Sequence, residues 1–262
     1  MKQELSKKTR TESDLIGSRE VPESALYGVQ TLRGIENFRI SKFHLNEYPL
    51  FIQALAITKM GAAIANRELD LLTKEQTDAI LKACKEILEG KYHDQFPVDM
   101  IQGGAGTTTN MNANEVIANR ALELMGHQRG EYQYCSPNDH VNRSQSTNDA
   151  YPTAIHIGLY YTHLKLVKHF ETLIQSFRKK GEEFANIIKM GRTQLEDAVP
   201  MTLGQTFNGF ASILEHEVKN LDFAAQDFLT VNMGATAIGT GITAEPGYAE
   251  KCIAALGKIT GL

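Results

Sequence analysis

Two long stretches with helical apolar periodicity constrain the fold of this chain more than any other feature. The first runs from about Thr153 to Lys180 without a proline, and its apolar residues recur at three- and four-residue spacings. They are Ile155, Leu159, Leu166, Phe170, Leu173 and Phe177. At the usual helical rise, such a stretch is a rod of about 40 Å.

A matching stretch runs from Leu203 to Phe228. Its apolar residues are Leu203, Phe207, Phe210, Leu214, Leu221, Ala225 and Phe228. Rods of this length are seldom covered within one small domain, so the pattern predicts a mainly α fold with a helical bundle, formed within or between subunits. A lone coiled-coil rod is the alternative, but it would not account for the polar segments that precede both stretches.

Shorter helices are expected elsewhere. Thr73 and Gln76 have the spacing of a capping box, apolar residues follow at helical spacing, and Gly90 ends the segment. Further helices are expected over about residues 50–69 and 112–125, with another beginning at Pro246 and running to about residue 256. Residues 35–41 are the best of few strand candidates.

Three uncharged or weakly charged segments, rich in hydroxyl and amide side chains, interrupt this helical pattern. They cover residues 102–110, 136–149 and 191–200. The last two run into the long apolar stretches, so they are expected at helix ends, where free backbone N–H groups can meet an anion. For any one segment, simple helix capping by Ser, Thr and Asn is the alternative. Three together favour a site for a small carboxylate-bearing molecule.

Composition excludes several classes of protein. The chain has 262 residues, 42% hydrophobic and 22% charged, and a net charge of -4, which is typical of a globular protein and argues against nucleic-acid binding. No apolar stretch approaches the roughly 20 residues of a membrane span, and no signal-peptide pattern is found, so a cytoplasmic protein is expected. The three cysteines are odd in number and widely separated, which indicates neither a disulfide framework nor a metal site.

We expect three regions along the chain: an N-terminal extension over residues 1–12, an N-terminal domain over 13–146, and a helical bundle domain over 147–262. The bundle domain is expected to be incomplete, because the chain stops at Gly261-Leu262 after one short helix with no closing element. The sequence therefore reads as part of a longer protein.

The polar segments resemble the conserved motifs of a known enzyme family. Gln102-Gly-Gly-Ala-Gly-Thr-Thr-Thr-Asn110, Ser144-Gln-Ser-Thr-Asn-Asp149 and Gly191-Arg-Thr-Gln-Leu-Glu-Asp-Ala-Val-Pro200 are similar, in this order, to motifs of the aspartase/fumarase superfamily, and within it to those of aspartate ammonia-lyases. The entry segment from Leu15 to Phe38 resembles the start of that family as well. The resemblance extends from about residue 12 to the end of the chain.

The resemblance implies an N-terminal helical domain followed by part of a long-helix bundle, in a homotetramer whose active sites each draw on three subunits. It implies reversible elimination of ammonia from L-aspartate to give fumarate, without a cofactor; activation by a divalent metal is left open. The residues implied to contact substrate are Thr107, Ser146, Thr147, Asn148, Thr193 and Gln194. Thr193 would hold the α-carboxylate, Thr107, Ser146 and Thr147 the β-carboxylate, and Asn148 the amino group.

The family's catalytic base is a serine on a Gly-Ser-Ser loop, and residues 1–262 contain no such loop. We therefore assign no base within this sequence, expect that serine beyond Leu262, and expect residues 1–262 alone to be inactive.

One residue bears on the choice of leaving group. Fumarases and some aspartases have histidine where this chain has Gln194, and glutamine does not titrate near neutral pH. This favours loss of ammonium, which carries its own extra proton, over loss of hydroxide. A class II fumarase-like hydro-lyase and a catalytically silent structural protein on the same scaffold remain the alternatives.

Arg192 could bind a carboxylate, but Glu196 and Asp197 beside it favour a buried ion pair.

Overall fold

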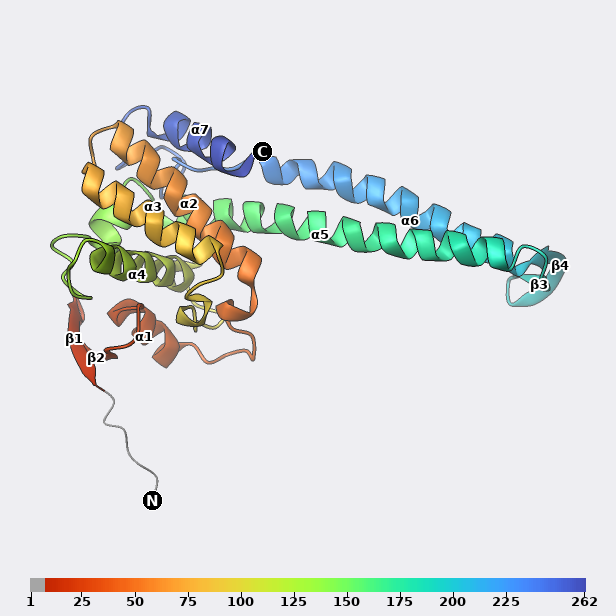
Figure 1. Cartoon of the computed structure of the whole chain (residues 1–262), viewed down its shortest axis with the longest axis horizontal. Coiled ribbons are helices and arrows are strands. Elements are labelled where there is room, and N and C mark those ends of the chain that lie inside the picture. The colour runs from red at the N-terminus through yellow and green to blue at the C-terminus, as the bar shows by residue number, and fades with distance from the viewer. Residues whose placement is uncertain (1–7) are drawn as a thin grey trace, which may run out of the picture. The chain divides into compact units, whose positions relative to one another are not determined.

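The computed structural model describes residues 8–262, so the first seven residues of the predicted N-terminal extension lie outside the described part. The chain forms two compact units, each described by itself. The first comprises residues up to Gly158 together with Val231–Leu262, and the second comprises Leu159–Thr230. Helices dominate both units (Figure 1), which confirms the mainly α fold class. The predicted domain limits at residues 12 and 146 stay a prediction.

The first unit is built around helix α2 (Pro49–Glu68). This helix packs against α3 (Lys74–Leu88) and α7 (Tyr248–Thr260), and α3 packs in turn against α4 (Thr107–Leu124). On its other side α4 contacts α1 (Val29–Asn37). The core of the first unit consists of buried aliphatic side chains from these helices, including Ile52, Leu55, Ile80, Ile87, Ile117 and Leu122. Because α2 is covered on several sides, its apolar residues extend around the helix rather than along one stripe.

The shorter predicted helices are found close to their expected positions. Thr73 caps α3 by accepting from the backbone N–H of Gln76 at 3.1 Å, and the Gln76 side chain accepts from the backbone N–H of Thr73 at 3.1 Å. This is the predicted capping box. The helices over residues 50–69 and from 246 onward are also confirmed, as α2 and α7.

Two helices begin earlier than the sequence indicated. Helix α4 begins at Thr107 rather than near Asn112, and α5 (Thr147–Glu183) begins at Thr147 rather than near Thr153. The polar residues that suggested loops form the first turns of these helices. Pro152 is tolerated within α5 because the carbonyl of Asn148, which a residue at 152 would otherwise bond, accepts instead from Asn232 Nδ2 at 3.0 Å.

The strand prediction over residues 35–41 was wrong. Helix α1 continues to Asn37, and the backbone N–H groups of Ile40 and Ser41 donate to the Asp99 carboxylate rather than to another strand. The strands of the first unit lie earlier, in an antiparallel hairpin of β1 (Thr9–Asp14) and β2 (Gly17–Pro22). Short helical turns, η1 (Leu45–Glu47), η2 (His93–Gln95) and the π-type turn η3 (Pro137–Val141), connect the longer helices.

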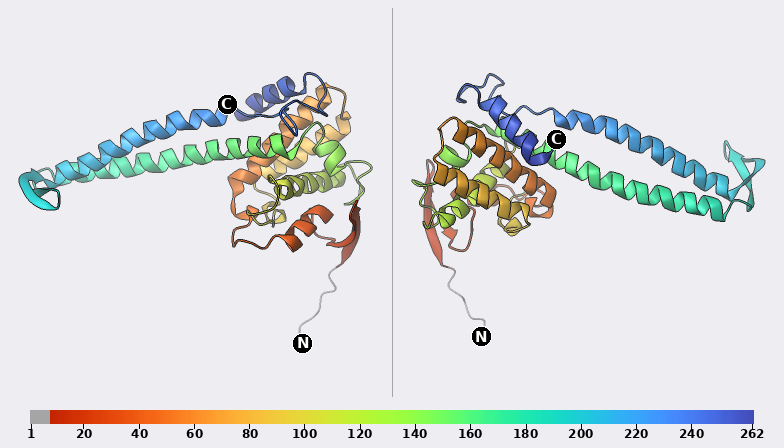
Figure 2. Two further views of the ribbon diagram at one scale, coloured as in Figure 1. Left: turned by 180° about the vertical axis from the view of Figure 1, so that it is seen from behind. Right: turned by 45° about the horizontal axis from the view of Figure 1, so that its top comes forward.

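The second unit is a helical hairpin. The distal part of α5 and helix α6 (Leu203–Ala225) run side by side (Figure 2), and η4 (Gln226–Leu229) follows α6. Phe177 packs on Phe207 and Phe210, with ring centroids 6.0 and 5.7 Å apart, and Arg178 pairs with Glu215 at 2.8 Å. The two long apolar stretches are thus confirmed as helices that pack on each other.

The third polar segment is a β-hairpin rather than a loop. Strands β3 (Ile188–Thr193) and β4 (Glu196–Thr202) pair antiparallel and join α5 to α6. Gln194 and Leu195 form the turn with φ values of 50° and 67°. Positive φ at both central residues is the requirement of a type I′ turn, whose twist matches that of paired strands. The sequence concealed this turn because neither residue is Gly, Asn or Asp.

Candidate functional site

Four of the six predicted contact residues lie at the first turns of two helices in the first unit. Thr107 is the first residue of α4. Ser146 directly precedes α5, which begins with Thr147 and Asn148. The two turns meet, since Asn110 Nδ2 of α4 donates to Thr147 Oγ1 at 3.1 Å. The structure therefore brings the first and second polar segments together.

The approach of these two turns depends on a glycine. Gly106 precedes α4 with a φ of 86°, and a Cβ at this position would lie 2.5 Å from the ring of Tyr151 in α5. Thr107 and Asn148 are exposed, whereas Ser146 and Thr147 are partly buried. The first N–H groups of a helix have no partner within the helix, and the helix dipole favours an anion there. The arrangement can therefore bind a carboxylate with neutral donors.

Asp149 fixes the start of α5 to a distant loop. Its Oδ1 atom accepts from the backbone N–H of Ser146 at 2.9 Å, and its Oδ2 atom accepts from the N–H groups of Gly234 and Thr236 at 3.1 and 2.9 Å. The side chain is fully buried. The loop over residues 234–241, which is rich in glycine and alanine, is thereby held beside the second polar segment. Sequence reasoning missed this contact, because its partners are backbone groups more than 80 residues away.

The same loop orients the Asn148 side chain. Asn148 Nδ2 donates to the backbone carbonyl of Ala237 at 2.8 Å, and the backbone carbonyl of Asn148 accepts from Asn232 Nδ2. Since the amide nitrogen is directed at a carbonyl, the Asn148 Oδ1 atom remains available as an acceptor.

A buried lysine lies behind the two turns. Lys59 of α2 is 0% exposed, and its Nζ atom donates to Asn110 Oδ1, Asn142 Oδ1 and Gln145 Oε1 at 2.7, 2.9 and 2.9 Å. Burial lowers the pKa of Lys59 to about 7, and the charge of Asp149 acts in the opposite direction. Three oxygen acceptors compensate the buried ammonium.

Sequence reasoning overlooked Lys59. The residue occupies the middle of a helix that is otherwise nearly all apolar, between Thr58 and Met60. A charged residue is almost never fully buried unless it is paired, so its position in this helix was the available signal. Its partners could not be found in the same way, because they come from α4 and from the segment before α5.

Asp99 positions the start of the first polar segment. Its carboxylate accepts from the backbone N–H groups of Ile40, Ser41 and Ile101 at 2.7–2.8 Å and from the Ser41 hydroxyl. Burial opposes the charge on Asp99, but these hydrogen bonds prevail and lower its pKa to about 2. Gln102 then bridges the Asp99 carbonyl and Thr109 of α4.

Thr193 and Gln194 are not part of the group in the first unit. They belong to the second unit, where Thr193 ends β3 and Gln194 begins the turn to β4. Both side chains are exposed. Arg192 pairs with Asp197 at 3.1 Å, as predicted, but the two side chains are 74% and 67% exposed, so the expectation of a buried pair was wrong.

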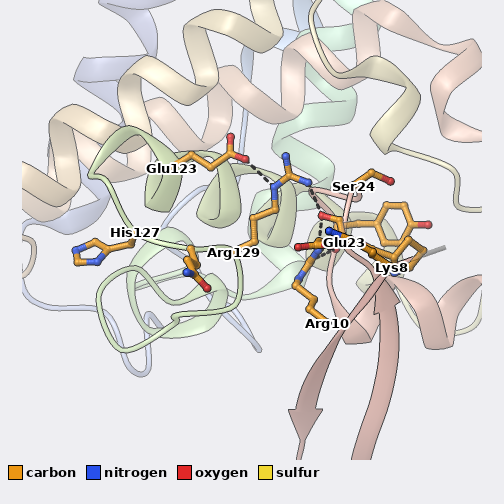
Figure 3. Close-up of a pocket in the computed structure, with 10 residues that line it drawn as sticks. Lys8, Arg10, Glu23, Ser24, Glu123, His127 and Arg129 are labelled. Atoms are coloured by element: carbon orange, nitrogen blue, oxygen red, sulfur yellow. Dashed lines mark hydrogen bonds and ion pairs between the residues drawn. The ribbon is translucent and has the colours of Figure 1, made fainter. Parts of the chain in front are cut away.

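A separate cavity of about 940 Å³ lies in the first unit at the base of β1 and β2. Figure 3 shows that its two arginines are directed at protein groups: Arg10 donates to backbone carbonyls, among them that of Glu23, and Arg129 donates to Glu123 and to the same carbonyl. None of the six predicted contact residues lines this cavity. Its arginines hold the chain that enters α1.

The side chains that could bind a metal or act as thiols are scattered or buried among residues 8–262. No group of three or more His, Cys, Asp or Glu side chains in this range has the geometry to hold a metal ion. All three cysteines are buried as free thiols, and burial raises the pKa of Cys135 to about 12. Among the described residues, no helix is long and apolar enough to cross a membrane.

Comparison with known proteins gives a consistent result. The model of a family described as "Lyase" matches residues 17–262. The chain is 56% identical over 253 residues to an aspartate ammonia-lyase of Pseudomonas canavaninivorans, covering 96% of this chain and 53% of that protein. It is 54% identical over 258 residues to an aspartate ammonia-lyase of Escherichia coli K12, covering 98% of this chain and 54% of that protein.

Two solved structures with the same fold are a fumarate lyase and a fumarase. A fumarate lyase:delta crystallin from Brucella melitensis bound to cobalt has a TM-score of 0.92 and 50% identity, over 97% of this chain and 55% of that one. A class II fumarase from Schistosoma mansoni has a TM-score of 0.88 and 35% identity, over 97% of this chain and 53% of that one. The chain spans about half the length of the curated relatives it matches.

Proposed function

Because this chain belongs to the aspartase/fumarase superfamily of lyases, we propose that the protein is an aspartate ammonia-lyase, which eliminates ammonia reversibly from L-aspartate to give fumarate. Such a reaction removes a proton from the carbon beside the β-carboxylate, while the ammonium group on the neighbouring carbon leaves as neutral ammonia with the C–N electron pair. The electron pair of the broken C–H bond forms the second bond between these two carbons in fumarate. No electrons are exchanged with a cofactor.

The observation that carries this proposal is the meeting of the first turns of α4 and α5. Proton removal places a second negative charge on the β-carboxylate, so donors are needed where charge develops. In our proposal, those donors are the hydroxyls of Thr107, Ser146 and Thr147 and the first backbone N–H groups of both helices that no side chain caps. They are neutral and fixed by the fold, so they can stabilise the developing charge with little reorganisation.

We assign the substrate amino group to Asn148. Its Nδ2 atom is engaged by the Ala237 carbonyl, which leaves Oδ1 to accept a hydrogen bond from an ammonium group. Gln194 supports the same leaving group, because a glutamine can orient ammonium but cannot protonate hydroxide. We assign Thr193 to the α-carboxylate.

We further propose that the protein is a homotetramer in which sites are shared between subunits. In the second unit several large apolar side chains are exposed, including Leu164 at 50%, Ile213 at 60% and Phe223 at 82%. Packing these faces against other copies would remove them from water. Thr193 and Gln194 could then reach the first unit of a different subunit.

The general base is not assigned to any residue of this chain. The family resemblance implies a serine on a Gly-Ser-Ser loop, a sequence that residues 1–262 do not contain. We propose that residues 1–262 expressed alone release no fumarate.

A hydro-lyase acting on malate is the second candidate, and the similarity to the Schistosoma mansoni class II fumarase favours it. Assays of the intact gene product with L-aspartate and with L-malate in parallel, followed by the ultraviolet absorbance of fumarate, separate the two. We expect fumarate from aspartate only. Fumarate from malate alone would replace the proposed reaction by a hydro-lyase, and fumarate from neither would favour a catalytically silent protein.

A further inference from the structure

The amide groups around Lys59 have a fixed orientation. Three oxygen acceptors around Nζ favour the protonated form of Lys59, and an ammonium has only hydrogen-bond donors, so any amide that contacts it must present oxygen. Asn110, Asn142 and Gln145 all do so, at 2.7–2.9 Å from Nζ. Their NH₂ groups must therefore point away from the lysine.

This orientation determines what Asn110 offers to Thr147. Asn110 Nδ2 donates to Thr147 Oγ1 and to Asn142 Oδ1, both at 3.1 Å. If the Asn110 amide were reversed, its oxygen would face the Thr147 hydroxyl and accept its hydrogen. Because Lys59 prevents this reversal, Thr147 Oγ1 accepts a hydrogen bond from the protein and keeps its own hydrogen for another acceptor.

Thr147 is well placed to use that hydrogen. It is the first residue of α5 and is only partly buried, whereas Lys59 and Asn110 are 0% and 1% exposed. A hydroxyl that accepts one hydrogen bond is also a stronger donor in the next, since chains of hydrogen bonds polarise one another.

We propose that Lys59 is a positioning residue which, through Asn110, commits the Thr147 hydroxyl to donate toward the substrate β-carboxylate. This rests on the proposed function, in which Thr147 contacts substrate. Lys59 itself touches no reacting atom. Its role is to select one of two orientations of a buried amide, a choice that packing alone does not make because the two ends of the amide have nearly the same shape.

The decisive variant is Asn110→Asp in the intact gene product. The carboxylate has the shape of the amide and keeps the Lys59 contact, but it presents oxygen to Thr147 and so accepts the hydroxyl hydrogen. Removing one donor from a developing oxyanion typically costs about 10²- to 10³-fold in kcat. We expect a loss of about 10²-fold in kcat/KM for aspartate.

A double-mutant cycle separates this effect from a general structural one. In a Thr147→Val background, where no hydroxyl remains, Asn110→Asp should cause little further loss. Lys59→Met, which frees the Asn110 amide to reverse, should show the same coupling to Thr147→Val and serves if Asn110→Asp does not fold. Asn114→Asp is the matched control, since Asn114 Nδ2 donates to Asn142 Oδ1 but makes no hydrogen bond to Thr147 among the described residues.

The outcomes are distinguishable. Coupling of Thr147→Val to Asn110→Asp and Lys59→Met, but not to Asn114→Asp, supports the role of Lys59. Losses that multiply independently in an active protein overturn that role and leave the proposed function intact. An unmodified protein that releases no fumarate from aspartate overturns the proposed function and this role together.

Discussion

Asp149 Oδ2 accepts a hydrogen bond from the backbone N–H of Thr236 at 2.9 Å, which joins the first turn of α5 to a loop 87 residues later in the chain. The same oxygen accepts from Gly234, so one buried carboxylate orders the loop that holds the Asn148 amide. The position of a proposed contact residue thus depends on a side chain that touches no substrate.

Asp149→Asn should destabilise the protein and weaken substrate binding. In either orientation the amide directs its NH₂ group at a backbone N–H donor, that of Ser146 or those of Gly234 and Thr236, and hydrogen bonds to charged groups contribute about 1.5–3 kcal/mol each. We expect a loss of about 2–4 kcal/mol in stability, seen as a lower Tm, and a higher KM for aspartate. Asp70→Asn, at a 90% exposed side chain paired only with Arg67, is the matched control. An unchanged Tm in Asp149→Asn would contradict this structural role.

Asp99 should contribute to the acid stability of the protein. Its pKa is lowered from 3.8 to about 2, so its stabilising contribution is complete above 3.8 and is lost as the pH falls through about 2. The difference in Tm between the native protein and Asp99→Asn should therefore be largest near neutral pH and shrink across this acid range. Thermal melts of both proteins over the same pH series test this, and a difference that stays constant would show that the carboxylate charge is not the cause.

Thr193→Ala in the intact protein should raise the KM for aspartate and lower kcat. The threonine is assigned to a carboxylate that is bound in both the ground state and the transition state, so both constants should change. Thr172→Ala removes the same atoms from a threonine whose hydroxyl donates to its own helix, and it should leave both constants unchanged. Unchanged kinetics in Thr193→Ala would exclude this threonine from the site.

Gln194→His should fold normally without becoming an efficient hydro-lyase. The residue is exposed with a φ of 50°, a conformation that histidine adopts more readily than most residues. One titratable side chain does not rebuild the pocket around a leaving group, so malate turnover should stay low. Efficient release of fumarate from malate by this variant would assign the choice of leaving group to residue 194.

The helices were predictable from sequence because their signals are local. The Thr73–Gln76 capping box and the apolar spacing of the long stretches each involve residues within a few turns. The helix starts at Thr107 and Thr147 were missed, because Thr and Asn occur both in loops and in first turns. What extends these helices is a glycine with positive φ before Thr107 and, for Pro152, a distant asparagine that occupies the freed carbonyl.

The site was only partly predictable, because some of its contacts join segments that are distant in the sequence. Family motifs pointed to hydroxyl and amide residues, but nothing in those motifs pointed to Lys59 or to the backbone partners of Asp149. Both contacts join segments more than 50 residues apart. The hairpin over residues 188–202 was likewise missed. Its turn has positive φ at glutamine and leucine, two residue types that do not indicate such a turn in a sequence.

The most direct test of the proposed function is the stoichiometry of products formed from L-aspartate by the intact protein. Fumarate and ammonia should appear in equal amounts, and adding both in excess should drive the reaction back to aspartate. Thr147→Val should lower the rates at which fumarate and ammonia form by the same factor. Fumarate without ammonia, or no fumarate from a folded protein, would contradict the assignment of this chain to an ammonia-lyase.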